Sequence, residues 1–268
     1  MLRHALVSLA VALVATPACA IPAPAPVIDA QLARPALWVV GDDDTIIYLF
    51  GTFHALDDRI PWFDHAVRAA FEGSDELVLE TLVPDSPEAF RAALARYRPS
   101  ATPAAGLMGA HTAMTAARSV GLSARNGADE VLQRAAVAER KPVIGLEKFE
   151  AQLAMYDRLP GRTLAPASTS AAATPDPAVA AFMRQLVAAW TSGDPRTFEA
   201  VVDAVQAQSP ESYQLLFAER NATWANWISE RLKQPGIVFV AVGTGHLVGR
   251  DSVQAQLAAH GIRSARVN

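Results

Sequence analysis

The feature that most constrains the fold is an unbroken apolar run at residues 237–242, which stops at Gly-Thr-Gly-His, 243–246. A run this long and rich in β-branched residues predicts a strand buried on both faces, in the middle of an α/β sheet. The pattern occurs once more, where the apolar run 45–50 leads into Gly-Thr-Phe-His at 51–54. In open α/β sheets, ligands bind beyond the carboxyl ends of the strands. These first and second Gly-Thr-x-His motifs therefore predict two histidines at one edge of a sheet.

The elements after the first motif bring a carboxylate to the same edge. Apolar residues at helical spacing over 62–71 are followed by a strand pattern that ends at Glu80. Strand, helix and strand form a βαβ unit, so we expect His54 and Glu80 to end neighbouring parallel strands. Alternation of this kind predicts the α/β class. Further strands are expected at 37–40, 142–147 and 263–267, and further helices at 88–98, 128–140, 149–159, 179–190, 195–208, 209–233 and 252–260.

Composition excludes several functional classes. The 268 residues carry a net charge of −4 and contain no basic run, which argues against nucleic acid as a partner. Cys19 is the only cysteine and falls in a predicted leader, so the mature chain is expected to lack thiol nucleophiles, thiolate metal sites and disulfides. Imidazole and oxygen ligands remain.

The N-terminus predicts export. A basic start precedes an apolar stretch at 5–15 that is too short to span a bilayer, and Ala18-Cys19-Ala20 matches a cleavage site. We expect a signal peptide at 1–20, cleaved near Ala20, and a periplasmic or secreted mature protein without a stable membrane span. An uncleaved anchor and a lipoprotein modified at Cys19 are the alternatives.

Two Ala- and Pro-rich segments are not expected to form folded elements. Residues 21–36 read as a lead-in to the domain, and residues 161–177 contain little besides Ala, Ser, Thr and Pro. Such a composition is typical of a surface loop or flexible linker, because it cannot bury enough apolar surface to fold.

The two motif histidines and a carboxylate predict a metal site. His54, His246 and Glu80 would supply three ligands and leave an open position for water, as in mononuclear divalent-metal sites. Gly51 and Gly243 are expected to allow a sharp exit from each strand with positive φ, and close approach of the backbone to a ligand. The alternative is a pair of structural histidines satisfied by backbone carbonyls.

Arg220 falls on the apolar stripe of the helix predicted at 209–233. A buried guanidinium needs a partner, and Glu80 is a natural one. Arg220 could instead bind a substrate carboxylate or stabilise an oxyanion, or form a structural salt bridge. Asn221 could orient a ligand or water. Glu147, at the end of a predicted strand, would support the site, or alternatively cap a helix or pair with a surface arginine.

These residues resemble the TraB/GumN family, which is related to PrgY and to the Tiki metalloproteases. The most specific match is the stretch 241–249, around the second motif. The resemblance implies a single domain over 37–268, interrupted by the insertion at 161–177: an α/β duplication with a mixed central sheet flanked by helices and two strand-Gly-x-x-His units. It also implies that both motifs and the glutamate form the site, with a divalent ion such as manganese, cobalt or zinc. The other matching segments are 51–54, Glu80, 145–147 with Glu150 and Gln152, and 219–221 with Trp224.

We therefore expect an exported metal-dependent hydrolase that resembles peptidases and acts on a peptide or small molecule. His54 and His246 would ligate the ion, Glu80 would ligate it or act as general base, and Arg220 and Asn221 would assist. One alternative is a non-catalytic protein that sequesters a peptide, haem or metal. Another is a metal-free esterase in which a histidine–glutamate pair activates water. A dinucleotide loop at 243–249 is rejected, because too little chain follows for a βαβ unit.

Overall fold

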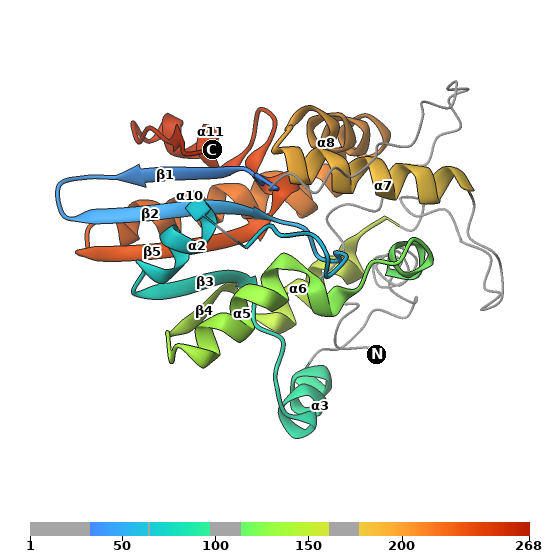
Figure 1. Ribbon diagram of the computed structural model, residues 1–268, viewed down its shortest axis with the longest axis horizontal. Coiled ribbons are helices and arrows are strands. Elements are labelled where there is room, and N and C mark those ends of the chain that lie inside the picture. The colour runs from blue at the N-terminus through green and yellow to red at the C-terminus, as the bar shows by residue number, and fades with distance from the viewer. Residues whose placement is uncertain (1–32, 64, 97–113, 161–176) are drawn as a thin grey trace.

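The computed structural model describes residues 33–63, 65–96, 114–160 and 177–268. Its centre is a mixed six-stranded sheet in the order β4-β3-β5-β2-β1-β6 (Figure 1), so the predicted α/β class with a mixed sheet is confirmed. The predicted leader, most of the lead-in and all but the last residue of the predicted insertion lie outside the described residues. The strands are β1 (Leu37–Gly41), β2 (Thr45–Thr52), β3 (Glu76–Thr81), β4 (Val143–Glu147), β5 (Gly236–Gly243) and β6 (Ala265–Arg266).

One prediction about the sheet is wrong: β2 and β3 are not neighbours. β5 lies between them and pairs in parallel with both, while β1 runs antiparallel to β2 and β6. β5 takes the centre because it is buried on both faces, with Val238 and Phe239 fully covered. The inferred consequence survives, because parallel strands present their carboxyl ends at the same edge whether or not they are adjacent.

The register of β2 against β5 brings the two motifs together. Phe50 lies opposite Ala241, and Thr52 lies opposite Gly243. The motifs therefore leave the sheet side by side at its carboxyl edge. An internal duplication beyond these shared endings stays a prediction, since β2 leads into a loop and β5 into a short 3₁₀ helix, η4 (Thr244–Leu247).

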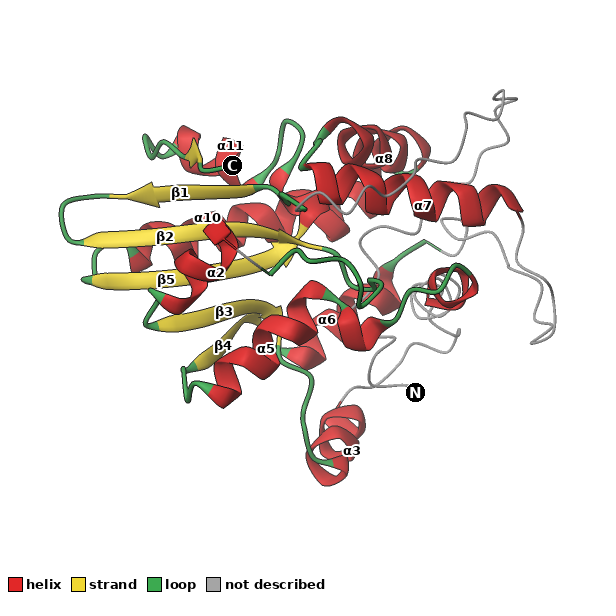
Figure 2. Cartoon of the chain, viewed as in Figure 1, coloured by secondary structure: helices red, strands yellow, loops and turns green. Residues whose placement is uncertain are grey.

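Helices cover both faces of the sheet (Figure 2). On one face of the sheet, a core cluster joins Phe50, Phe239 and their neighbours to α2, α5, α7 and α8. On the opposite face, a second cluster joins Val240 and its neighbours to α10 and α11. Strand residues alternate between these clusters, as the period of two requires. The helices are α2 (His65–Glu72), α3 (Pro87–Arg96), η2 (Ala124–Asn126), α5 (Ala128–Ala138), α6 (Phe149–Arg158), α7 (Pro177–Ser192), α8 (Arg196–Gln208), α9 (Pro210–Tyr213), α10 (Glu219–Arg231) and α11 (Val253–Ala259).

The long helix predicted at 209–233 contains an irregularity. Between α9 and α10 the chain forms a π turn, Gln214–Ala218, in which the Glu219 N–H donates to the Gln214 carbonyl five residues back. Turns of this kind inside α-helices are rare and are frequent at functional sites. This one ends two residues before Arg220, whose guanidinium donates to the Leu216 carbonyl at 3.1 Å.

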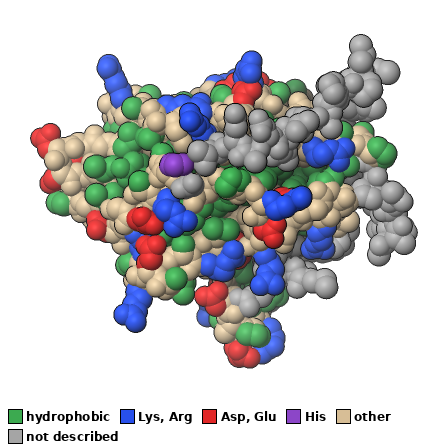
Figure 3. Space-filling model, viewed as in Figure 1, with side chains coloured by type: hydrophobic (Ala, Val, Ile, Leu, Met, Phe, Trp, Pro, Cys, Tyr) green, Lys and Arg blue, Asp and Glu red, His purple; other side chains and the backbone are tan. Residues whose placement is uncertain are grey.

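The surface of the molecule mixes both signs of charge on the face in Figure 3, where acidic and basic side chains are interspersed. In the described part of the chain, no helix combines the length and apolar character that crossing a membrane requires.

Candidate functional site

His54, in the first motif, is fixed by the start of α5. Its Nδ1 lies 3.1 Å from Asp129 Oδ1, so the ring donates its Nδ1–H to the carboxylate. Backbone contacts hold the two elements together, because the Ala128 N–H donates to the Phe53 carbonyl at 2.9 Å. A Cβ at Gly127 would lie only 2.4 Å from the His54 carbonyl oxygen, so this approach requires glycine. The other ring nitrogen, Nε2, is buried and has no hydrogen-bond partner in the described structure.

The charges around His54 make its imidazole easier to protonate than a histidine side chain in water. Burial lowers the pKa of the imidazole, but the Asp129 carboxylate, through its charge and hydrogen bond, and the Glu80 carboxylate outweigh it, so the pKa lies above the ordinary value. Nε2 is the atom that gains or loses this proton, because Nδ1 is held by Asp129.

A second buried polar atom of the first motif also lacks a partner. The Thr52 hydroxyl is enclosed, with the residue 1% exposed, and accepts or donates no hydrogen bond within the described residues. Leaving a buried polar group unsatisfied costs about 1–3 kcal/mol, so such groups call for a specific explanation. Thr52 and His54 line the same pocket, which gives both groups a common place for a ligand.

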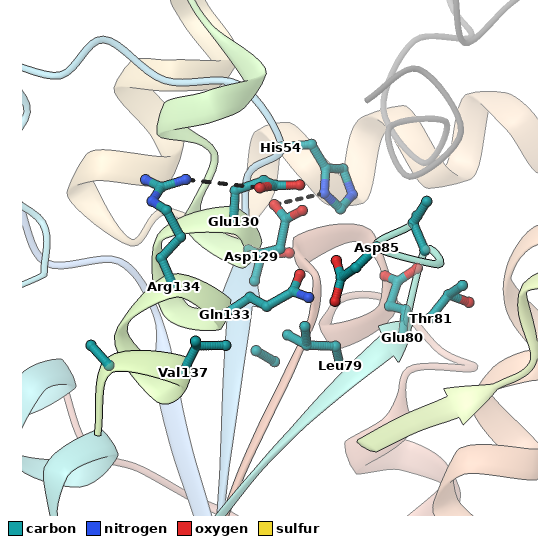
Figure 4. Close-up of a pocket in the computed structure, with 14 residues that line it drawn as sticks. His54, Leu79, Glu80, Thr81, Asp85, Asp129, Glu130, Gln133, Arg134 and Val137 are labelled. Carbon is teal, nitrogen blue, oxygen red and sulfur yellow. Dashed lines mark hydrogen bonds and ion pairs between the residues drawn. The ribbon is translucent and has the colours of Figure 1, made fainter. Parts of the chain in front are cut away.

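This pocket, which we call the α5 groove, has a volume of about 650 Å³, within the range of small-molecule sites. Figure 4 shows α5 as one wall and β3 as the opposite wall, with Asp85 between His54 and Glu80 in this view. The polar end is formed by Thr52, His54, Glu80, Asp85, Asp129 and Glu130, and the groove continues past Gln133, Arg134, Val137 and Leu79.

The second motif is closed by its own partners. The Thr244 hydroxyl donates to the Thr52 carbonyl at 2.9 Å. His246 is fully buried, and its Nδ1 lies 2.6 Å from Asn221 Oδ1. The Asn221 amide is itself oriented by donating to the Asp251 carbonyl at 2.7 Å, so His246 donates through Nδ1 and carries its lone pair on Nε2. Burial lowers the pKa of His246 to about 3, although the Glu80 charge opposes that shift.

Arg220 donates a hydrogen bond to the lone pair of His246 and forms ion pairs with the carboxylates of Glu80 and Glu147. Its Nη1 lies 3.1 Å from His246 Nε2, and its Nη2 lies 2.8 Å from Glu80 and 2.7 Å from Glu147. The guanidinium also lies over the Trp224 ring, 4.6 Å from the centroid. This confirms the sequence inference that a core-facing arginine must be paired, with Glu80 as one partner.

Glu80 is the carboxylate that connects the two motifs. Its Oε1 accepts the Gly243 N–H at 2.6 Å and lies 3.6 Å from His246 Nε2. Burial acts to raise the pKa of Glu80, but the charges of Arg220, His246 and His54 and the Gly243 hydrogen bond hold it down at about 2. Glu80 is therefore ionised throughout the physiological range.

The prediction that Gly51 and Gly243 adopt positive φ is wrong. Gly243 has φ of −53°, and Gly51 is absent from the described glycines with positive φ. A Cβ at Gly51 would lie 2.9 Å from the Thr244 hydroxyl oxygen, so this glycine allows the two motifs to pack against each other. Gly243 contributes its N–H to Glu80.

The predicted ligands suit a divalent ion in kind but not in arrangement. His54 Nε2 carries a lone pair that has no partner among the described residues, and its Nδ1 is held by a carboxylate, as is usual for metal-binding histidines. The lone pair of His246, however, faces the cationic Arg220. Across the described ranges, no three His, Cys, Asp or Glu side chains are close enough together to hold an ion.

Two residues of the site were missed by sequence reasoning. Asp129 stands in the first turn of a helix, where acidic residues are common because they interact with the helix dipole, so its position carries no functional signal. Thr52 belongs to the motif, but its sequence position resembles that of Thr244, which is satisfied by a hydrogen bond. The two threonines differ only in their hydrogen bonds in the folded structure.

Comparison with known proteins gives a family and uncharacterised relatives. The model of the TraB/PrgY/gumN family matches residues 36–98 and 82–266. Proteins called "Uncharacterized protein YbaP" in Escherichia coli (strain K12) and in Shigella flexneri are each 33% identical over 143 residues, which is 53% of this chain and 52% of theirs. The match thus spans about half the length of these curated relatives. No solved structure matches.

Proposed function

The chain belongs to the TraB/PrgY/gumN family, and from that premise and its site we propose that it is a hydrolase, peptidase-like in substrate, whose reacting bond lies against His54 and Thr52. The observation that carries the proposal is the pair of buried polar atoms, His54 Nε2 and Thr52 Oγ1, that have no partner in the described structure and line one pocket. A substrate carbonyl and a water molecule would satisfy both.

In this proposal His54 is the general base. Water attacks the carbonyl carbon, and Nε2 takes the water proton as the new C–O bond forms. The Thr52 hydroxyl donates to the carbonyl oxygen as it becomes negative. The C–N bond then breaks, and the proton on Nε2 passes to the leaving nitrogen, giving a carboxylic acid and an amine.

Asp129 has a positioning role in the same scheme. Its carboxylate accepts the Nδ1–H of His54 at 3.1 Å, which orients the ring and leaves Nε2 to face the substrate. The carboxylate also stabilises the imidazolium that forms when Nε2 takes a proton, as a buried aspartate does for other catalytic histidines.

Glu80 lines the groove and, with Arg220, joins it to the closed second motif. The predicted catalytic roles of Glu80, Arg220 and Asn221 stay predictions. Their contacts favour a positioning role for Arg220 and Asn221, because the hydrogen bonds of both residues run to His246 and its neighbours. Glu147 supports Arg220 in the same way.

The manganese, cobalt or zinc ion that the family resemblance implies remains part of the proposal as an alternative form of the site. His54 Nε2 and Glu80 would hold it, and it would polarise the carbonyl group. His246 would be a further ligand only if Arg220 moved away from the lone pair on His246 Nε2. Metal analysis of purified protein, with His54→Ala alongside, tests this: an ion bound to the parent and absent from the variant would support it.

The test of hydrolysis is cleavage of a blocked peptide library, followed by mass spectrometry, with and without EDTA. We expect cleavage by the parent protein and a loss of about 10²–10⁴-fold in His54→Gln, the range for removing a general base. His260→Gln is the matched control, because His260 lies outside the groove and contacts Ser229. Equal cleavage by parent and His54→Gln would remove the proposal, and cleavage that EDTA abolishes would favour the metal-dependent form.

The second candidate is a non-catalytic protein that sequesters a peptide, haem or metal. The same two unpartnered atoms favour it, because they would also satisfy a ligand that is not turned over. Stoichiometric binding without any product over long incubation would select this function. Export to the periplasm or medium stays a prediction in either case, and cell fractionation with N-terminal sequencing tests it.

A further inference from the structure

The hydrogen bonds around the second motif converge on one cation. The guanidinium of Arg220 lies 2.8 Å from Glu80, 2.7 Å from Glu147 and 3.1 Å from His246 Nε2. Glu147 is held by two parallel bonds, because its other carboxylate oxygen accepts from Arg220 Nε at 3.1 Å. Two carboxylates and a neutral imidazole are also groups that bind divalent ions in proteins. The guanidinium therefore lies where the chemistry of its neighbours would suit a metal ion.

Two of these groups are oriented by further side chains. His246 donates its Nδ1–H to Asn221, and metal-binding histidines are oriented in the same way through their second nitrogen. Glu147 accepts from the Thr81 hydroxyl at 3.3 Å and from the Gln152 amide at 3.4 Å. Gln152 is buried, and its Oε1 has no partner among the described residues. An environment this rich in acceptor atoms favours a cation at its centre.

Charge and size explain how an arginine can fill such a place. Burial acts to lower the pKa of Arg220, but the charges of Glu147 and Glu80 raise it above the ordinary value, so the side chain stays charged. Its nitrogens lie 2.7 to 3.1 Å from the surrounding groups, whereas bonds from zinc to nitrogen or oxygen measure about 2.0–2.2 Å. While the guanidinium separates them, the side chains in this described part of the chain are too far apart to hold an ion together.

We propose that Arg220 is a built-in cation, which takes the place of a divalent ion between the second motif and the two glutamates. The ligand set that the family resemblance implies therefore does not fit this half of the site, and any bound ion would be held through His54 without His246. The inference goes beyond the proposed hydrolysis and does not depend on it, because it concerns only which groups can coordinate an ion.

The first test compares the parent protein with His246→Gln. Full-length protein is freed of metal with EDTA, dialysed and titrated with Co²⁺, and calorimetry and the visible spectrum of the ion report binding. We expect the two proteins to bind the same number of ions with the same affinity, and a parent that binds none would agree with the proposal. Loss of a Co²⁺ site in a His246→Gln protein whose circular dichroism is unchanged would overturn it.

The second test removes the arginine in a His54→Gln background, where the first motif no longer offers its imidazole. We expect Arg220→Ala to bind Co²⁺ at least about tenfold more tightly than the background protein, because the positive charge that repels an ion is gone. Adding either His246→Gln or Glu147→Gln should remove this gain. Arg220→Lys should show no gain, since it keeps a positive charge at this position.

The matched control is Arg231→Ala in the same background. Arg231 also belongs to α10, and its Nε lies 2.8 Å from Glu76, with the two side chains only 13% and 20% exposed. Glu76 begins β3, whereas Glu80 lies near the end of that strand. The control therefore breaks a partly buried arginine–glutamate pair away from the second motif, and it should not raise the affinity for Co²⁺.

Several results of the second test would overturn the proposal. These are an Arg220→Ala protein without a gain, a gain that both added substitutions leave intact, and an equal gain in Arg220→Lys or Arg231→Ala. If Arg220→Ala is unfolded without metal, Co²⁺ should restore its circular dichroism, and a protein that stays unfolded in Co²⁺ would also overturn the built-in cation. Peptide cleavage by the parent protein tests the proposed function separately.

Discussion

The two Gly-Thr-x-His motifs have the same residues at three of four positions and leave adjacent strands, yet they differ in every hydrogen bond of their functional groups. In the first motif, Thr52 Oγ1 and His54 Nε2 have no partner in the described structure. In the second, the Thr244 hydroxyl and both nitrogens of His246 are bonded. The pKa of the imidazole lies above its ordinary value in the first motif and near 3 in the second.

The difference arises from what each motif meets after the strand ends. The first meets the N-terminal turn of α5, which contributes one carboxylate and leaves a groove. The second meets α10, which contributes an amide and a guanidinium and fills the space around the ring. A shared motif thus fixes where a histidine lies in the sheet, while neighbouring helices decide whether it is reactive or structural.

Paired substitution of the histidines is the most severe way to break this comparison. His54→Gln should lower kcat/KM by about 10²–10⁴-fold, because a general base is lost, and should cost about 1 kcal/mol of stability through the hydrogen bond to Asp129. His246→Gln should lower stability by about 1–3 kcal/mol, because Asn221 or Arg220 loses a buried partner. Peptide cleavage and urea unfolding of both variants measure the two effects. Equal losses of activity at matched stability would show that the motifs are equivalent.

Removing the guanidinium that closes the second motif should have the next largest effect. Arg220→Met leaves the buried Glu80 and the half-buried Glu147 without their common partner. Breaking a buried ion pair from one side typically costs about 3–5 kcal/mol. Urea unfolding measures the loss. A second variant that also changes Glu147 to Gln should recover part of it, and a stability unchanged in Arg220→Met would mean that the cluster is not held by this arginine.

The pH dependence should sharpen the comparison, because the two histidines act with opposite sign. His54 has a raised pKa, so its contribution to stability is complete below the unfolded value of about 6.5 and is lost as pH rises through the folded value. His246 has a pKa lowered to about 3, so it destabilises the fold increasingly as pH falls from about 6.5 toward 3. Because only the neutral form of His54 can act as a base, the rate of cleavage should increase as the pH rises above about 6.5.

Proton NMR of the histidine rings checks this directly. The ring signal assigned to His54, by its absence in His54→Gln, should titrate above the ordinary imidazole range. The signal of His246 should stay constant until the pH approaches 3. Two rings that titrate together near 6.5 would contradict the assignment of one motif as open and the other as closed.

The threonines should give the smallest effect and the finest comparison. Thr52→Val removes a hydroxyl that bonds nothing in the described structure, so stability should be unchanged or slightly higher while cleavage falls about tenfold or more. Thr244→Val removes the bond to the Thr52 carbonyl and should lower stability by about 1 kcal/mol. Thermal unfolding and kcat/KM of both variants decide the matter. A valine at 52 that leaves kcat/KM unchanged would exclude the oxyanion role.

Sequence reasoning reached the positions that depend on local pattern. The apolar runs before each motif predicted β2 and β5, and the location of Glu80 at a strand end followed from its own run. Arg220 was expected to be buried and paired because it interrupts an apolar stripe, and its pairing with Glu80 is confirmed. Each of these inferences uses only residues close in sequence to the predicted strand or to Arg220.

What sequence reasoning missed depends on contacts between distant segments. β5 enters the sheet between β2 and β3, although it is formed near the end of the chain, and no local signal specifies that order. The partner of His54 is 75 residues away, at a helix start where aspartate is common for other reasons. The inequality of the two motifs has the same origin, since their own residues are nearly alike.

The π turn before α10 sets which side chains of that helix face the sheet. An α-helix advances about 100° per residue, so one residue more or fewer in the turn Gln214–Ala218 would rotate α10 by that amount against the sheet. Arg220 and Asn221 would then swing away from His246, while the remainder of the helix could still present an apolar side. A single-residue deletion at this point would therefore dismantle the closed motif while leaving His246, Asn221 and Arg220 themselves in the sequence.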